Sequence, residues 1–233
     1  MRARRVYGHI SRMNTLYKDR INYIDLGLHM GFELEEMMIK IFPYLELYNV
    51  KAHGFEASLD YARHNRKKYE RFMYLNIDIY HAAIGDTEEH VKLYKTDPKI
   101  SPVQHLGSSI FRSKKNVCDE YEMVPGVIFS NWLKKKVPNY KQEINILKVN
   151  IEGAEYHLFK DMVENDLLQY FPLIIGAGHD VDKVSELDSD EYWKLVKNNN
   201  ITIHRFCSDF KRHKNVNITQ MIYDLVAKRT LDS

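Results

Sequence analysis

A short apolar run that ends in an acid and two glycines most constrains how this chain folds. Residues 21–26, INYIDL, have the length and composition of a buried strand. Gly27 and Gly31 follow, and residues 32–42 then carry apolar side chains at helical spacing until Pro43. Glycine at a strand-to-helix turn permits a positive φ and lets a ligand approach the backbone. The segment therefore predicts a strand, a tight turn and a helix, with a ligand site at the turn.

The same alternation of strand and helix continues along the chain. We expect further strands at 50–55, 75–84, 91–94, 144–151, 172–175, 201–206 and 220–227, and helices at 58–72, 130–137, 154–165 and 190–197. This spacing predicts an α/β domain whose mostly parallel sheet is covered by helices on both faces. Residues 1–20 are expected to form an arm or helix, and residues 21–233 a single domain.

Residues 95–123 interrupt the alternation with a stretch that is rich in proline, glycine and serine and has little periodicity. A long loop in a compact domain is usually functional or disordered. We therefore expect this segment to be a loop near the site that becomes ordered over a bound cofactor.

Composition excludes several other classes of protein. The net charge of +2, with 28% charged residues, argues against a dedicated nucleic-acid or membrane-surface binder. The two cysteines are far apart, and the chain has no CxxC or HExxH, so neither a disulfide framework nor a metal site is expected. No apolar run is long enough to span a bilayer. We expect a cytoplasmic protein.

The residues around the first turn indicate the chemistry of the ligand. The glycine spacing is G-x-x-x-G rather than the G-x-G-x-x-G of dinucleotide sites, and Asp25 would repel a diphosphate. A carboxylate suits an ammonium or a sulfonium, and S-adenosylmethionine carries both. Glu56 ends the next strand, where an acid can accept two hydrogen bonds from a ribose diol. Ala82 and Ala83 are small enough to let a flat base lie against the backbone.

Five motifs, DLGLHMG, GFE, HAAIGD, the GSS of the long segment and ILKVNIEGAEYHLF, occur in an order that resembles the FkbM-type methyltransferases. The resemblance covers roughly residues 21–180. It implies a class I, S-adenosylmethionine-dependent enzyme with a Rossmann-like, mostly parallel seven-stranded sheet and helices on both faces. It also implies a set of cofactor-binding residues, namely Asp25, Gly27, His29, Gly31, Glu56, Ala83, Ser108 and Ser109.

Three positions depart from the pattern of that family. Leu28 replaces an alanine and His29 an asparagine in the first motif, so Leu28 would add bulk near the cofactor. Asn150 stands where the family has aspartate. A neutral amide is a poor metal ligand and cannot take up a proton, so a metal or base role at position 150 is weakened. The departures favour an altered substrate or an inactive relative.

Methyl transfer needs an aligned acceptor and, for a hydroxyl acceptor, a general base. We expect the base among Glu152, His179 and Asp180, which follow two of the predicted strands. Glu155 is expected to have a structural role at the start of a helix.

The leading hypothesis is O-methylation of a saccharide or another small molecule. One alternative is an RNA or protein methyltransferase, although the weak net charge speaks against RNA. Another is a catalytically inactive, methyltransferase-like interaction module, which Leu28 and Asn150 favour. A nicotinamide-dependent oxidoreductase is disfavoured by the missing G-x-G-x-x-G.

Overall fold

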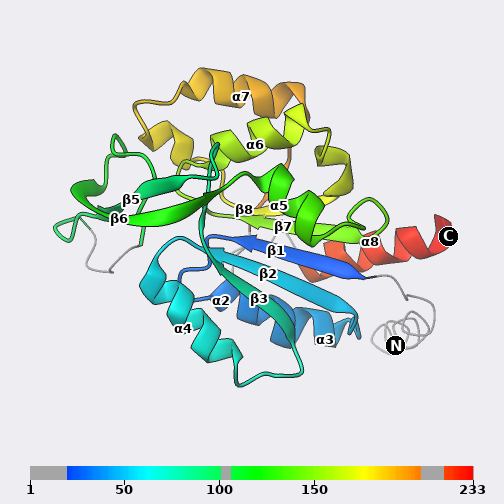
Figure 1. Ribbon diagram of the computed structural model, residues 1–233. Helices are drawn as coiled ribbons and strands as arrows, with labels where there is room; N and C mark the ends of the chain where they lie inside the picture. The colour runs from blue at the N-terminus through cyan, green and yellow to red at the C-terminus, as the bar shows by residue number, and fades with distance from the viewer. Residues whose placement is uncertain (1–19, 101–105, 206–217, 233) are drawn as a thin grey trace.

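A sheet of six parallel strands forms the centre of the molecule (Figure 1). The computed structural model describes residues 20–100, 106–205 and 218–232. In spatial order the strands are β3 (Asn76–His81), β2 (Val50–Glu56), β1 (Ile21–Leu26), β7 (Ile144–Val149), β8 (Leu173–Gly176) and β9 (Ile203–His204). The order reverses direction between β1 and β7, which is the point where ligands bind in open parallel sheets. The predicted parallel α/β architecture is therefore confirmed.

Helices cover both faces of this sheet, as predicted. One face packs on α5 (Phe129–Lys136), α6 (Glu155–Glu164) and α7 (Ser189–Asn198). The other packs on a continuous helical segment made of α2 (Phe32–Glu35), the π-helical η1 (Glu36–Ile41) and α3 (Phe42–Tyr44), and on α4 (Leu59–Tyr69) and α8 (Ile218–Asp232).

The pleat of β1 explains this division. Ile24 and Leu26 belong to the first core, whereas Ile21 and Tyr23 belong to the second. Successive side chains of a strand point to opposite faces, and a strand buried on both faces reads as one apolar run. The two short 3₁₀ helices, η2 (Leu168–Tyr170) and η3 (Asp180–Lys183), flank β8.

A second, three-stranded sheet lies beyond the carboxyl ends of the central strands (Figure 1). It contains β4 (Ala83–Ile84), β6 (Val117–Val127) and β5 (His90–Thr96), in that order. The predicted strand at 75–84 is thus two strands, because the chain passes from one sheet to the other at Ala82. The predicted loop at 95–123 is also corrected, since its last seven residues lie in β6. Most of β6 is exposed or half-buried, so it shows no apolar alternation.

Two further predictions about the sheet are wrong. The central sheet has six strands, rather than seven, in the described part of the chain. Residues 220–227, expected as a strand, lie inside α8, whose buried residues Ile218, Ile222 and Val226 recur every four positions. The N-terminal arm, apart from Arg20, and the end of the strand predicted at 201–206 fall outside the described residues.

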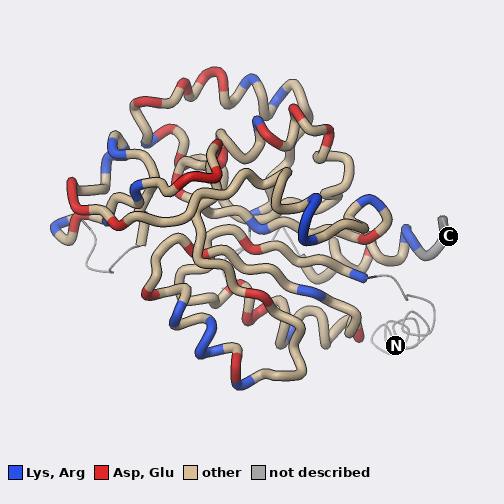
Figure 2. The backbone as a smooth tube through the Cα atoms, in the orientation of Figure 1, with Lys and Arg blue, Asp and Glu red and all other residues tan. Residues whose placement is uncertain are grey.

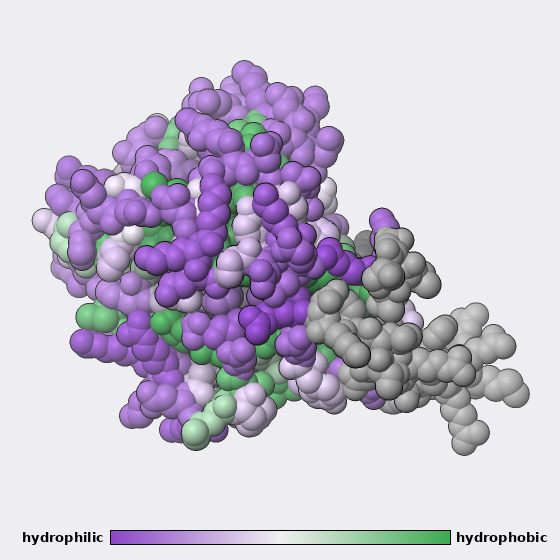
Figure 3. Space-filling view, turned by 45° about the vertical axis from the view of Figure 1, so that its right-hand side comes forward, coloured by the Kyte–Doolittle hydropathy of each residue, from purple (hydrophilic) through white to green (hydrophobic). Residues whose placement is uncertain are grey.

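The described helices include none that is both long and apolar enough to cross a membrane. The face drawn in Figure 3 is mostly hydrophilic, with smaller hydrophobic areas between the polar side chains.

Candidate active site

A cleft opens at the carboxyl ends of β1, β2 and β7. Its walls come from the β1–α2 turn, the end of β2, residues 82–84, the segment 106–110 and the β7–α6 turn. These elements lie at the reversal point of the strand order, and the second sheet contributes Ala83, Ile84 and Leu93 to the lining.

The backbone amides of the β1–α2 turn are already hydrogen-bonded within the protein. The N–H groups of Gly27 and Leu28 both donate to the Phe55 carbonyl oxygen, at 3.1 and 3.0 Å. The His29 N–H donates to a Glu56 carboxylate oxygen at 2.6 Å. Gly27 has a φ of 87°, and a Cβ there would overlap the Asn150 carbonyl oxygen. The turn therefore needs glycine for a close backbone crossing, and its amides do not form a cradle for phosphate.

Glu56 lies at the end of β2 and lines the cleft. Its two carboxylate oxygens accept hydrogen bonds from the Ser58 N–H at 2.8 Å and from the His29 N–H. Burial raises the pKa of Glu56, while the same two hydrogen bonds act to lower it. An ionised carboxylate offers about four lone-pair sites, so two remain for a ligand. Beside it, the buried Ser58 hydroxyl lines the cleft without a hydrogen-bond partner among the described residues.

Asp25, expected to bind the cofactor, lies under the turn and is not one of the residues that line the cleft. Its fully buried carboxylate pairs with the Lys148 ammonium at 2.9 Å, and the Tyr23 hydroxyl donates to it at 3.4 Å. Burial raises the pKa of Asp25 to about 6, although Lys148 acts in the opposite direction. Lys148 also donates to the Gly27 carbonyl oxygen at 2.6 Å. The pair supports the turn from below.

Leu28 also points away from the cleft. Its side chain is 1% exposed and packs in the core between the sheet and helix α2. A Cβ on Gly54 of the neighbouring strand would come within 2.7 Å of Leu28 Cδ1. Gly54 thus makes room for Leu28, and the expectation that Leu28 adds bulk near the cofactor is corrected.

Five other expected cofactor residues line the cleft, namely Gly27, His29, Ala83, Ser108 and Ser109. The Ser109 hydroxyl is used internally, because it donates to the Glu152 carbonyl oxygen at 2.7 Å. Gly31 is not part of the lining; it precedes α2 with a φ of 70° and accepts a hydrogen bond from Tyr69 at 2.8 Å.

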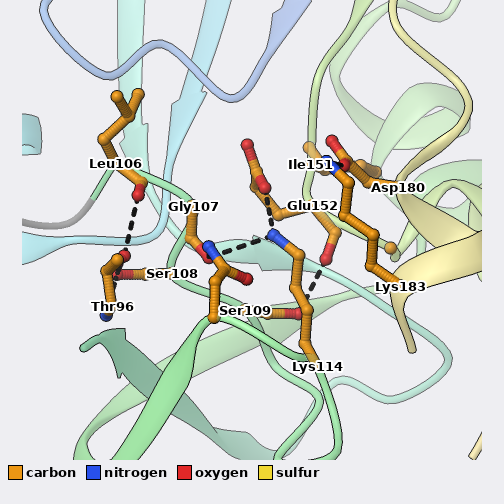
Figure 4. A network of polar contacts seen from close by, with 12 residues as sticks. Thr96, Leu106, Gly107, Ser108, Ser109, Lys114, Ile151, Glu152, Asp180 and Lys183 are labelled. Atoms are coloured by element: carbon orange, nitrogen blue, oxygen red, sulfur yellow. Dashed lines mark hydrogen bonds and ion pairs between the residues drawn. The ribbon is translucent and has the colours of Figure 1, made fainter. Parts of the chain in front are cut away.

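Glu152 is the expected catalytic residue that lines the cleft. It follows β7 with a φ of 59°, and its carboxylate pairs with the Lys114 ammonium (Figure 4). Lys114 was not predicted, since its sequence context, SKKN, resembles any solvated run of charge. In the structure its side chain is 1% exposed, and it also donates to the Gly107 carbonyl oxygen at 3.0 Å.

His179 and Asp180, the other expected catalytic residues, do not line the cleft. His179 is exposed just after β8, and the Asp180 carboxylate pairs with Lys183. Glu155 is buried and accepts hydrogen bonds from the Ile151 and Gly153 N–H groups at 2.8 and 2.7 Å. Burial raises its pKa to about 7. Glu155 thus holds the β7–α6 turn, which agrees with its predicted structural role.

The charged side chains that line the cleft are acidic, and one of them is paired with Lys114 behind the wall. Among the described residues that line it, Glu56 and Glu152 are acidic and none is lysine or arginine. Elsewhere in the described chain, acidic and basic residues are interspersed over the helices and loops (Figure 2). No group of three His, Cys, Asp or Glu side chains in these residues is arranged to hold a metal ion.

Comparisons with known proteins give one likeness. No family model matches the chain, and no curated protein matches it. Among solved structures, the chain is similar to the crystal structure of the methyltransferase FkbM from Methylobacillus flagellatus KT, with 12% sequence identity and a TM-score of 0.37. The match covers 66% of this chain and 35% of that one. A likeness of this size does not determine an activity, so the function proposed below rests on the cleft.

Proposed function

We propose that this protein is an S-adenosylmethionine-dependent methyltransferase that methylates a hydroxyl group on a saccharide or another small molecule. The observation that carries the proposal is the cleft at the reversal point of the sheet, whose described lining includes two carboxylates, of which Glu152 is paired with Lys114, and no lysine or arginine. A cationic nucleoside suits this lining, whereas a dinucleotide would bring a diphosphate to a turn whose amides are already used.

The lining residues fit the parts of this cofactor one by one. The Glu56 carboxylate can accept from the ribose hydroxyls, with Ser58 beside it as a further hydrogen-bonding group. Ala82, Ala83 and Ile84 offer small and apolar surface to the adenine ring. The methionine part then extends over Gly27 toward the β7–α6 turn. When bound, the cofactor supplies the methyl group and the leaving group, and the protein aligns the acceptor and excludes water.

The acceptor is proposed to enter from the side of β8. His179 is exposed there, beyond the residues that line the cleft, and an imidazole nitrogen can take up a proton, so we assign it the role of proton acceptor for the acceptor hydroxyl. An RNA substrate is less suitable, because the described residues show interspersed charges rather than a basic stripe (Figure 2).

Calorimetric titration with S-adenosylmethionine and S-adenosylhomocysteine tests the proposal. We expect micromolar binding to the wild-type chain. Glu56→Gln should weaken it about tenfold or more, because hydrogen bonds to a charged acceptor are lost. Asp60→Asn, which removes an exposed acid on the first turn of α4, is the matched control and should bind like the wild type.

Transfer from tritiated cofactor to a panel of saccharides and other hydroxyl compounds then separates the remaining hypotheses. Methylated products would support the enzyme. Cofactor binding without transfer to any acceptor class, including RNA and protein, would favour the inactive interaction module. Failure to bind either cofactor form would overturn the proposal.

A further inference from the structure

Lys114 is a buried cation at the edge of the cleft, and it has no role in the function proposed above. Its side chain is 1% exposed, its ammonium donates to the Gly107 carbonyl oxygen at 3.0 Å, and it pairs with the Glu152 carboxylate (Figure 4). A lysine is almost never buried to this extent unless it is paired. Burial of the Lys114 ammonium is unfavourable by itself, and the carboxylate that compensates for it belongs to Glu152, which lines the cleft.

Glu152 is fixed by contacts with both its backbone and its side chain. A φ of 59° is uncommon for a residue other than glycine and persists only where the surroundings hold it. The Ser109 hydroxyl donates to its carbonyl oxygen at 2.7 Å, and the next amide, of Gly153, donates to Glu155. Lys114 binds the Oε2 atom, so the lone pairs of Oε1 remain for a ligand. The result is an oriented carboxylate in the cleft wall.

The strand order indicates which part of the cofactor meets this carboxylate. Glu56 ends β2 and Glu152 follows β7, with β1 between them. If the ribose lies at Glu56 and the base at Ala83, the amino-acid part extends across β1 toward β7. Asp25, the other acid near this path, is paired with Lys148 below the turn. Glu152 is thus the acid in the cleft wall that faces the ammonium end.

We propose that Lys114 is a positioning residue that holds the Glu152 carboxylate so that Glu152 accepts a hydrogen bond from the ammonium group of the bound cofactor. This inference rests on the proposed function, and it makes Glu152 a binding residue rather than the expected general base. The contact lies between the segment 106–116 and the β7–α6 turn, so Lys114 also joins two walls of the cleft.

The test compares ligands with and without the amino-acid part by calorimetry on the full chain. The probes are S-adenosylhomocysteine, which carries the ammonium, and 5′-methylthioadenosine, which lacks it. The variants are Lys114→Met, Glu152→Gln and the double variant, with Lys115→Met as the control. Lys115 is the exposed neighbour, and its backbone N–H donates a hydrogen bond to the Lys183 carbonyl oxygen at 3.1 Å. Thermal unfolding of each variant shows whether it is folded.

We expect Lys114→Met and Glu152→Gln each to weaken S-adenosylhomocysteine about tenfold, because a charge-assisted hydrogen bond is lost or misdirected. Binding of 5′-methylthioadenosine should change less than twofold. The double variant should be no weaker than Glu152→Gln, since Lys114 acts through Glu152. Lys114→Arg keeps the cation and should retain the wild-type ratio of the two affinities within about threefold.

Several results would overturn the inference. Equal weakening of both ligands would give Lys114 a general structural role, and additive losses in the double variant would show that it does not act through Glu152. If Lys114→Met does not fold, an unchanged affinity ratio in Glu152→Gln would be decisive by itself. A wild-type chain that binds neither ligand would instead refute the proposed function, so the two failures are distinguishable.

Discussion

The fit between Leu28 and Gly54 gives a prediction that can be worked out from distances. In Gly54→Ala, the new Cβ would lie 2.7 Å from Leu28 Cδ1, 3.0 Å from Leu28 Cδ2 and 3.1 Å from Ile79 Cδ1. Leu28 is 1% exposed and packed in the core, so it cannot turn into solvent. Overpacking of this kind should lower the free energy of unfolding by about 2 kcal/mol.

Substitution of Leu28 enlarges the same space that Gly54→Ala would overfill. Leu28→Ala removes the atoms that crowd position 54 and leaves a cavity, at a cost of about 3 kcal/mol. In Leu28→Ala/Gly54→Ala the added methyl group enters the vacated space. We therefore expect the double variant to lose about 3 kcal/mol, rather than the roughly 5 kcal/mol that independent effects would give.

Urea unfolding at neutral pH, followed by circular dichroism, measures these differences. Gly85→Ala is the matched control, because a Cβ there would meet its nearest neighbour, Ile110 Cδ1, at an ordinary 3.6 Å. It should change the free energy of unfolding by less than about 0.5 kcal/mol. Losses that simply add in the double variant would refute the reasoning, since they would mean that Leu28 does not occupy the space above Gly54.

Two further predictions concern buried charges. Lys148→Met leaves the buried Asp25 carboxylate without its ion-pair partner. The free energy of unfolding at pH 7 should therefore be about 3–5 kcal/mol lower than in the wild type. A loss below about 1 kcal/mol would show that the pair does not support the turn. Burial, with the charge of Lys51, lowers the pKa of His53 to about 4 from an ordinary 6.5. As the pH falls below 6.5, the unfolded chain therefore takes up a proton that the native protein does not accept until about pH 4, and stability is lost. Between pH 7 and pH 5 the wild type should lose about 2 kcal/mol more than His53→Leu in urea unfolding, and equal losses would contradict this assignment.

The buried strands were predictable because a strand that is buried on both faces reads as an almost continuous apolar run in the sequence. Residues 21–26 and 144–149 are buried without exception, and both were expected as strands within two residues of their ends. Strand β6, in the second sheet, shows no such run, since most of its side chains are exposed or half-buried. The strand prediction at 220–227 was wrong because a short apolar run fits a strand as well as a buried helix. The helical spacing of the buried residues in α8 becomes clear once Ile218 is included.

The site was predictable in its position but not in the direction of each side chain. Glycines and acids at strand ends indicated the edge of the sheet at which the cleft opens, and Gly27, His29 and Glu56 line that one cleft. Asp25 lies at the same edge, yet its carboxylate turns beneath β1 toward Lys148. Lys114 lies in a segment with no periodic pattern, and its ion pair with Glu152 forms only through tertiary packing. The sequence therefore does not indicate that Lys114 is buried at the site.

The structure changes what Leu28 and Asn150, two of the departures from the family pattern, imply about activity. Leu28 faces the core and matches Gly54, so its bulk does not obstruct a cofactor. Asn150 lines the cleft and lacks a charge, but it keeps a hydrogen-bond donor and an acceptor. The negative charge at the β7 end is supplied by Glu152, two residues further on, with Lys114 as its buried partner. Neither departure therefore fills the cleft or removes its acidic side chains, so neither is by itself an argument for an inactive relative.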